Sequence, residues 1–105
     1  MDLKSARKRY IPMSETMFYI LFSLRGERHG YGIMQDVEKL TGGRIVLGAG
    51  TIYQSISKLV RDGLIVATQE INRQKKYRIT ETGLAILQEE AARIKEMAKV
   101  AEVLL

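Results

Sequence analysis

Cysteine and tryptophan are absent from this 105-residue sequence, and proline and histidine each occur once. Without cysteine there is no disulfide and no cysteine zinc site, and the single histidine, His29, excludes a histidine-rich metal site within one chain. No apolar run is long enough to span a membrane, and the first residues lack the pattern of a signal peptide. We therefore expect a cytoplasmic protein that binds no metal and no cofactor.

The residue sets that carry catalysis are missing as well. The sequence contains no Ser-His-Asp set and no phosphate-binding glycine loop. Its glycines fall near the expected ends of helices, where local backbone geometry accounts for them. A lone histidine before a helix, as at His29, is typical of a structural or exposed residue. The sequence predicts no catalytic residue and a protein that is not an enzyme.

Positive charge is abundant and unevenly distributed. The net charge is +5, and residues 1–12 and 64–80 each carry +3, whereas residues 81–105 carry −2. A chain of this length, 46% of it apolar, builds one small domain with one core. Two basic patches favour a polyanionic partner, and ordinary solubilising charge is the alternative.

Hydrophobic periodicity divides the chain into helices and strands. A basic, loosely ordered arm is expected at the start of the chain, ending near Pro12, which disfavours helix at the residue before it. The spacing of apolar residues predicts four helices, and β-rich runs predict three strands. The helices are expected at 15–25, 31–40, 48–63 and 81–105, and the strands at 44–47, 64–70 and 76–79.

The helix at 48–63 is the centre of the predicted organisation. Ile52, Ile56 and Leu59 recur at spacings of four and three, so they share one buried face. The other faces carry short polar side chains and cations, which are the types that contact base edges and phosphates. A solvated surface helix would have the same composition, so the segment that follows decides between the two interpretations.

After this helix the two strands at 64–70 and 76–79 form a hairpin with a cationic tip. The order helix, helix, short strand, helix and hairpin is that of a winged helix-turn-helix, in which the third helix enters the major groove and the hairpin follows the DNA backbone. The fold class is therefore mainly α (α+β), a winged helix-turn-helix with a long C-terminal helix. The basic tip lies where phosphates would be, which favours DNA binding over a merely solvated face.

Three blocks of the sequence also resemble the PadR family of transcriptional regulators. They are HGYGI (29–33), GTIYQSISKLVRDGLI (50–65) and KYRITETG (76–83), in register with one another. The resemblance implies a homodimeric winged-helix repressor of the short form, with a single C-terminal dimerisation helix. One departure is that Gly48 and Ala49 replace the family's usual Ser-Pro, so we expect a weaker cap at the start of that helix.

The candidate DNA contacts come from three places. Thr51, Gln54, Ser55 and Lys58 are expected at base edges or nearby phosphates, and Gln54 is the best candidate for an adenine contact. The arm residues 7–9 either add DNA contacts or only solubilise the chain. The complete predicted set is Tyr31, Thr51, Tyr53, Gln54, Ser55, Lys58, Arg61, Arg73, Lys75 and Lys76.

Two apolar surfaces predict a dimer. The helix at 15–25 is apolar almost all round, and the helix at 81–105 carries a heptad seam over about 37 Å, more than a small domain can cover. A second copy of the chain would cover both surfaces. The predicted interface comprises Phe18, Phe22, Leu84, Leu87, Ala91, Ile94, Met97, Ala98, Ala101 and Leu105.

The sequence therefore predicts a sequence-specific, homodimeric regulator of transcription that binds double-stranded DNA. It acts as a repressor on a near-palindromic operator, with a small-molecule effector at the dimer interface as a further partner. The alternative is a winged-helix module that binds proteins without reading DNA. The expected organisation is a basic arm (1–13), a winged helix-turn-helix domain (14–80) and a dimerisation helix (81–105).

Overall fold

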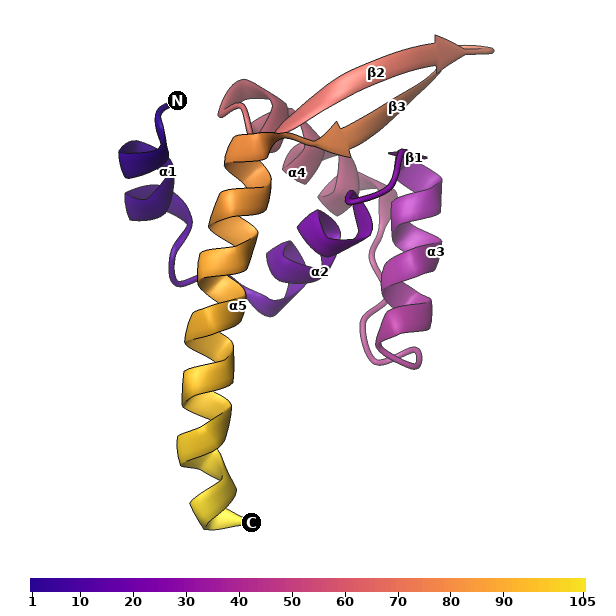
Figure 1. Cartoon of the computed structure of the whole chain (residues 1–105). Helices are drawn as coiled ribbons and strands as arrows, with labels where there is room; N and C mark the ends of the chain where they lie inside the picture. Colours follow the sequence, from indigo (N-terminus) through magenta and orange to yellow (C-terminus); the bar gives the residue numbers. More distant parts are fainter.

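The computed structural model describes residues 1–105 and contains five α-helices and a three-stranded sheet. In chain order the elements are α1 (Leu3–Tyr10), α2 (Glu15–Ser23), β1 (Arg28–His29), α3 (Gly30–Leu40), α4 (Ala49–Arg61), β2 (Ile65–Ile71), β3 (Gln74–Ile79), α5 (Glu81–Ala101) and the 3₁₀ turn η1 (Glu102–Leu104). In Figure 1, α5 runs as a long rod away from the other helices, and the β2–β3 hairpin projects from the opposite end of the molecule. This is the winged helix-turn-helix arrangement expected from the sequence.

Side-chain caps begin four of the five helices. Asp2 Oδ1 accepts the Ser5 N–H (2.7 Å) at the start of α1, and Ser14 Oγ accepts the Met17 N–H (3.1 Å) at the start of α2. Thr80 Oγ1 accepts the Gly83 N–H (3.1 Å) at the start of α5. Helix α4 begins at Gly48 with no side-chain cap, which confirms the weaker start expected for this helix.

The hairpin, called the wing from here on, is the outer part of the sheet. The strand order is β1-β3-β2 and both pairings are antiparallel. Asn72 (φ 53°) and Arg73 (φ 66°) form the two-residue turn at the tip, and both lie in the left-handed region that a tight hairpin requires. A break in register between Ala67 and Gln69 marks a bulge on β2.

The core lies where the helices meet the base of the wing. Ile52, Ile56 and Leu59 of α4 are buried, which confirms the apolar face predicted for this helix. They pack with buried residues from α1, α2 and the residue after it, α3, the connection before α4, the start of the wing and the first turns of α5. These partners are Ala6, Tyr10, Ile20, Leu21, Leu24, Ile33, Val37, Leu47, Leu64, Ile65, Ile86 and Leu87.

The N-terminal segment differs from the loosely ordered arm expected from the sequence. Residues Leu3–Tyr10 form α1, with Ala6 and Tyr10 buried in the core. The helix is held at both sides, because Tyr10 Oη donates to Asp62 Oδ2 (2.6 Å) and Arg7 pairs with Glu89 of α5 (2.9 Å). The expectation of a loose arm was therefore wrong: the buried pair at i and i+4 gives the segment an apolar face, and the ion pairs dock it.

The short strand expected at 44–47 was also wrong. Residues 45–48 form an irregular connection, and the Ile45 N–H donates to Thr41 Oγ1 (3.0 Å) instead of to a strand. The third strand is instead Arg28–His29, which pairs with Tyr77 and Lys76 of β3. Because β1 and β2 occupy the two edges of β3, the central strand has no edge left for residues 44–47.

Candidate nucleic-acid interface

Helix α4 presents a polar face that its own fold leaves uncovered. Thr51, Gln54, Lys58 and Arg61 are exposed, whereas Ser55 is half-buried on the flank of the helix. The face is continuous because positions at spacings of three and four lie one above another on a helix. It spans about 15 Å from Thr51 to Arg61, at about 1.5 Å of helix rise per residue. Four of the five predicted residues of this face are therefore available to a ligand.

One further residue of α4 was missed by the sequence reasoning. Ser57 is exposed and lies with Val60 and Arg61 along a groove between α4 and the wing, whose other wall includes Lys75 and Tyr77. The spacing could have identified it, because Ser57 follows Gln54 by three residues and precedes Arg61 by four, so it lies on the same polar face. Its position relative to the wing assigns it to the same surface.

The wing places its cations unequally. Arg73, at the tip, and Lys75 are exposed and line a hollow shared with α3 and α4. Lys76 is half-buried and pairs across the sheet with His29 of β1, so its side chain lies on the other side of β3 from that of Lys75. Of the three wing cations predicted together, Arg73 and Lys75 therefore face the hollow, whereas Lys76 does not.

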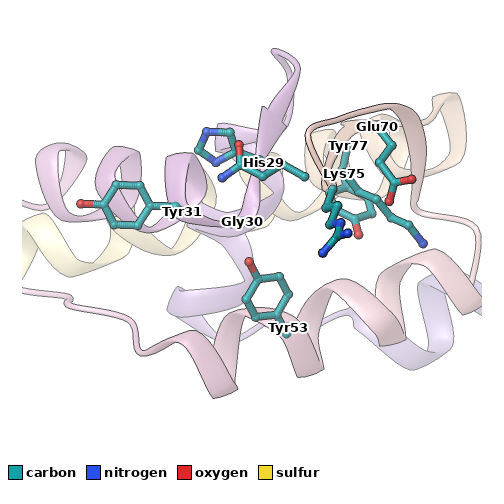
Figure 2. A pocket seen from close by; sticks show the side chains of 9 residues that line it. His29, Gly30, Tyr31, Tyr53, Glu70, Lys75 and Tyr77 are labelled. Carbon is teal, nitrogen blue, oxygen red and sulfur yellow. The ribbon is translucent and has the colours of Figure 1, made fainter.

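Figure 2 shows this hollow, which has a volume of about 210 Å³. Tyr31 and Tyr53 stand on either side of the start of α3, and both are more than half exposed, at 58% and 54%. The remaining lining residues come from β1, the first turn of α3 and the wing: His29, Gly30, Glu70, Arg73, Gln74, Lys75 and Tyr77. Two cations, three phenol hydroxyls and one carboxylate therefore share a concave surface beside α4.

The hydroxyl of Tyr77 remains protonated at neutral pH. Burial raises the pKa of Tyr77, and the neighbouring Tyr53 and Glu70 raise it further. The side chain can therefore donate a hydrogen bond to an anion. Glu70 opposes Lys75 across the β2–β3 ladder and partly offsets the positive charge of the hollow.

Two residues of the HGYG segment (29–32) shape the backbone and packing at the start of α3. His29 caps α3, because its Nδ1 accepts the Gly32 N–H at 3.0 Å, which confirms the structural interpretation of this histidine. At Gly30 an added Cβ would lie 3.0 Å from Cε1 and Cζ of Tyr53. The absence of a side chain at position 30 therefore lets the Tyr53 ring lie against the start of α3 and fixes the wall of the hollow.

Comparison with known proteins identifies the family. A family model described as the transcriptional regulator PadR-like family matches residues 19–89, more than half of the chain. The chain belongs to the PadR-like family. The match includes the PadR-type blocks quoted above and confirms the resemblance that they carry. It begins within α2, so α1 lies outside it.

Individual relatives of this PadR-like chain agree with the assignment. The transcriptional regulator YqjI of Escherichia coli (strain K12) is 32% identical over 84 residues, which are 79% of this chain and 41% of the relative. The chain thus spans about two fifths of the length of that curated relative. The solved structure of Bacillus subtilis PadR in complex with operator DNA is 28% identical, has a TM-score of 0.62, and the match covers 70% of this chain and 44% of that chain.

The fold extends to nearly the whole chain in another solved structure. A PadR family transcriptional regulator from Eggerthella lenta matches 97% of this chain and 87% of its own, with a TM-score of 0.71 and 23% identity. The residues of this PadR-like chain include no group of histidine, cysteine and acidic side chains that could hold a metal ion. None of its helices combines the length and the apolar character needed to cross a bilayer.

The predicted dimer residues fall into three groups by exposure. Leu87 is buried within its own chain, on the face of α5 that also carries Ile86 and Glu90. Three residues are half-buried, namely Phe18, Phe22 and Ile94, and the two phenylalanines pack against the core. The others are exposed: Leu84, Ala91, Met97, Ala98, Ala101 and Leu105. The exposed apolar surface of α5 thus lies mainly in its second half, where Val100 is also 71% exposed.

A second cavity, of about 340 Å³, lies between α2 and α5. Phe18 and Tyr19 line it from α2, and Ile94 and Met97 line it from α5. Next to it, the fully buried Glu90 pairs with Arg93 and accepts the Met13 N–H at 3.2 Å. The Arg93 hydrogen bonds hold the pKa of Glu90 below its ordinary value, so this carboxylate is charged at neutral pH and ties α5 to the start of α2.

Proposed function

We propose that this PadR-like chain is a sequence-specific, homodimeric transcriptional repressor that binds near-palindromic double-stranded DNA. The observation that carries the proposal is the exposed polar face of α4, which lies beside a wing that presents Arg73 and Lys75. In a winged helix-turn-helix these two surfaces meet the major groove and the DNA backbone. The operator complex of the related Bacillus subtilis PadR supports this use of the fold.

Each side chain has a role that follows from its type and place. Thr51, Gln54 and Ser55 read base edges, and Gln54 has the paired donor and acceptor that suit adenine. Lys58 and Arg61 contact phosphates beside the groove, as do the wing cations including Lys76. The hollow in Figure 2 receives a phosphate, which takes hydrogen bonds from the hydroxyls of Tyr31 and Tyr53 and the charge of Lys75.

The second copy of the chain covers the outer half of α5 and the half-buried aromatic face of α2. Met97 is 55% exposed and Leu104 is 87% exposed, and such a contiguous apolar surface on a soluble domain marks an interaction site. A two-fold axis through this surface gives two copies of α4. These copies read half-sites about 34 Å apart, one turn of the DNA helix.

A small apolar effector in the cavity between α2 and α5 would regulate binding. Met97 belongs both to this cavity and to the proposed interface, so a ligand there changes the angle between the two DNA-binding heads. Such a ligand weakens DNA binding only if it binds the DNA-bound arrangement of the two heads less tightly than the free arrangement, and only by that difference in affinity.

The test begins with selection of genomic fragments by the purified protein, followed by affinity measurements on the enriched duplex. Gln54→Ala should relax the preference at one base pair of each half-site. Lys75→Ala should weaken binding to all duplexes alike and reduce the slope of log K against log salt by about 0.9 per protomer. Lys39→Ala, an exposed change in the last turn of α3, is the matched control for the removal of one charge.

The outcomes separate the proposal from a protein-binding module. Salt-sensitive binding with a base preference that depends on Gln54 supports sequence reading. Equal losses of affinity on every sequence would contradict base readout by this residue. If no duplex binds in a salt-sensitive way, the chain is the winged-helix interaction module instead.

The dimer is tested separately by sedimentation. Met97→Glu places a charge in the apolar surface and should shift the protein from dimer to monomer. Ala92→Glu introduces the same charge on an exposed position of α5 off the seam and should leave the dimer intact. Equal sedimentation of the two variants would contradict an interface formed by this face of α5.

A further inference from the structure

Helix α1 lies beside the C-terminal end of α4, on the flank away from the wing. Tyr10 Oη and Arg9 Nη1 contact the two carboxylate oxygens of Asp62, at 2.6 and 3.0 Å, and Lys58 Nζ lies 5.2 Å above the Tyr10 ring. Ser57, by contrast, faces the groove beside the wing. In Figure 1, α1 lies on one side of the first turns of α5, and the wing projects to the other side. The DNA-facing helix is therefore bordered on one side by the wing and on the other by α1.

The anchor of α1 is a buried acidic group surrounded by cations. Asp62 is 4% exposed and pairs with Arg9 at 3.0 Å and with Arg61 at 3.6 Å. Burial opposes the charge of Asp62, but the hydrogen bonds from Tyr10 and Arg9 outweigh this effect and lower its pKa. The carboxylate is therefore ionised at neutral pH, and together with Lys58 the junction of α1 and α4 still carries an excess of positive charge.

Two more cations on α1 have no partner within the chain. Arg7 is committed to Glu89, and Asp2 is committed to the cap of the helix. Lys4 and Lys8 are exposed and belong to none of the ion pairs of the structure. The outward surface of α1 is therefore cationic, with two amines free to bind an anion.

The placement of these lysines is unfavourable for the helix by itself. Lys4 and Lys8 are four residues apart, so their like charges are neighbours on one face and repel each other. Lys4 also lies in the first turn, where the helix dipole disfavours a cation. The phosphates of a duplex would neutralise both charges, whereas nothing within the chain does so.

We propose that α1 is a second backbone-contacting element, in which Lys4 and Lys8, together with Lys58, bind phosphates on the side of the duplex opposite the wing. The proposal rests on the proposed function and extends its footprint to a helix outside the family match. Docking through Asp62 holds the backbone of α1 in place before DNA arrives, so binding does not have to order this segment. The duplex is thus held at α4 from both flanks.

The test is a salt series of binding to a random-sequence duplex of about 40 base pairs, long enough to span two half-sites. We compare the full chain with K4A/K8A and with the control K39A/K99A, which removes two exposed lysines from α3 and α5, away from α1 and the wing. K4A/K8A should make the slope of log K against log salt shallower by about 1.8 per bound protomer, which is about 0.9 for each phosphate that is no longer neutralised. The control should keep the wild-type slope.

A charge-preserving variant separates electrostatics from packing. K4R/K8R should restore the wild-type slope, because each arginine still neutralises a phosphate. If the wild type binds with a steep salt dependence and K4A/K8A behaves like the control, the role of α1 is overturned and the proposed function stands. If the wild type shows no salt-sensitive binding to either the random duplex or the enriched fragments, both are overturned.

Discussion

Gly83 is expected to be the least replaceable small residue of the chain. It lies in the first turn of α5, where the helix packs directly against the main chain at the base of the wing. A Cβ at this position would lie 2.1 Å from the carbonyl oxygen of Leu64 and 2.8 Å from Cγ1 of Ile79. Gly83→Ala therefore tests whether this close approach sets the position of α5 relative to the wing.

Two opposing effects decide the sign of the change. Alanine favours a helix over glycine by about 1 kcal/mol, which would stabilise α5. The Leu64 carbonyl cannot move aside freely, because it accepts the Thr80 N–H at 2.9 Å and Leu64 is fully buried. Overpacking costs about 1–3 kcal/mol, and a clash with backbone belongs at or above the upper end of that range. We expect a net loss of about 2 kcal/mol.

Thermal and urea unfolding, at a fixed protein concentration, measure this loss. For a domain of this size 2 kcal/mol lowers Tm by about 10 °C. Gly50→Ala is the matched control, because Gly50 lies in the first turn of α4 with no atom within 4 Å of an added Cβ. It should gain up to about 1 kcal/mol. A Gly83→Ala protein as stable as Gly50→Ala would refute the close packing of α5 on Leu64.

Three further predictions concern the hollow and the α1 anchor. Gly30→Ala should displace the Tyr53 ring, and because this ring is exposed and free to move, the free energy of unfolding should change by less than about 1 kcal/mol. The affinity for DNA should fall as much as in Tyr53→Phe, and anisotropy titrations of the two variants with DNA test this. Tyr10→Phe removes a hydrogen bond to a buried carboxylate and should cost about 1.5–3 kcal/mol in urea unfolding. The pKa of Asp62 in the folded state is lower than its ordinary value of 3.8, so the ionised carboxylate stabilises the fold fully above about pH 4, and this stabilisation is lost as the pH falls through the folded-state pKa. Asp62→Asn should therefore make the free energy of unfolding depend less on pH in the acid range.

The helices could be predicted from the sequence because their patterns are local. The buried positions of α4 recur at i, i+4 and i+7, and Thr80 and Ser14 stand as caps directly before α5 and α2. Long periodic segments with a cap signal depend little on the rest of the chain. The wing was predictable for the same reason, although its turn is tighter than the polar segment suggested and occupies only Asn72 and Arg73.

The short elements depend on partners that are distant in sequence. Strand β1 is two residues long, and only the free edge of β3, nearly fifty residues later, makes Arg28 and His29 a strand. Residues 44–47 have the composition of a strand but no edge to pair with. Helix α1 has two local signals, Asp2 as a cap and the buried pair Ala6 and Tyr10, yet its docking requires Asp62 and could not be seen in the segment alone.

The exposure of α5 also required the fold. A heptad seam places Leu84 and Leu87 on one stripe, but the domain buries Leu87 with Ile86 and leaves Leu84 at its rim. The apolar face of α5 is therefore used twice: its first turns close the core, and its second half remains free. Periodicity identifies the stripe, and only the packing of α1 and α2 shows where along the stripe the core ends.

The PadR-type blocks in this chain contain two kinds of residue with different roles. Gly30 and Gly83 have no side chain because Tyr53 and the Leu64 carbonyl occupy that space, so they fix where α4 and α5 lie. The exposed positions of α4, Thr51 and Gln54 among them, contact nothing that would fix their identity. Substitution at the two glycines should therefore change stability or geometry on every DNA sequence, whereas substitution at Gln54 should change which sequence is bound while the fold stays as stable as before.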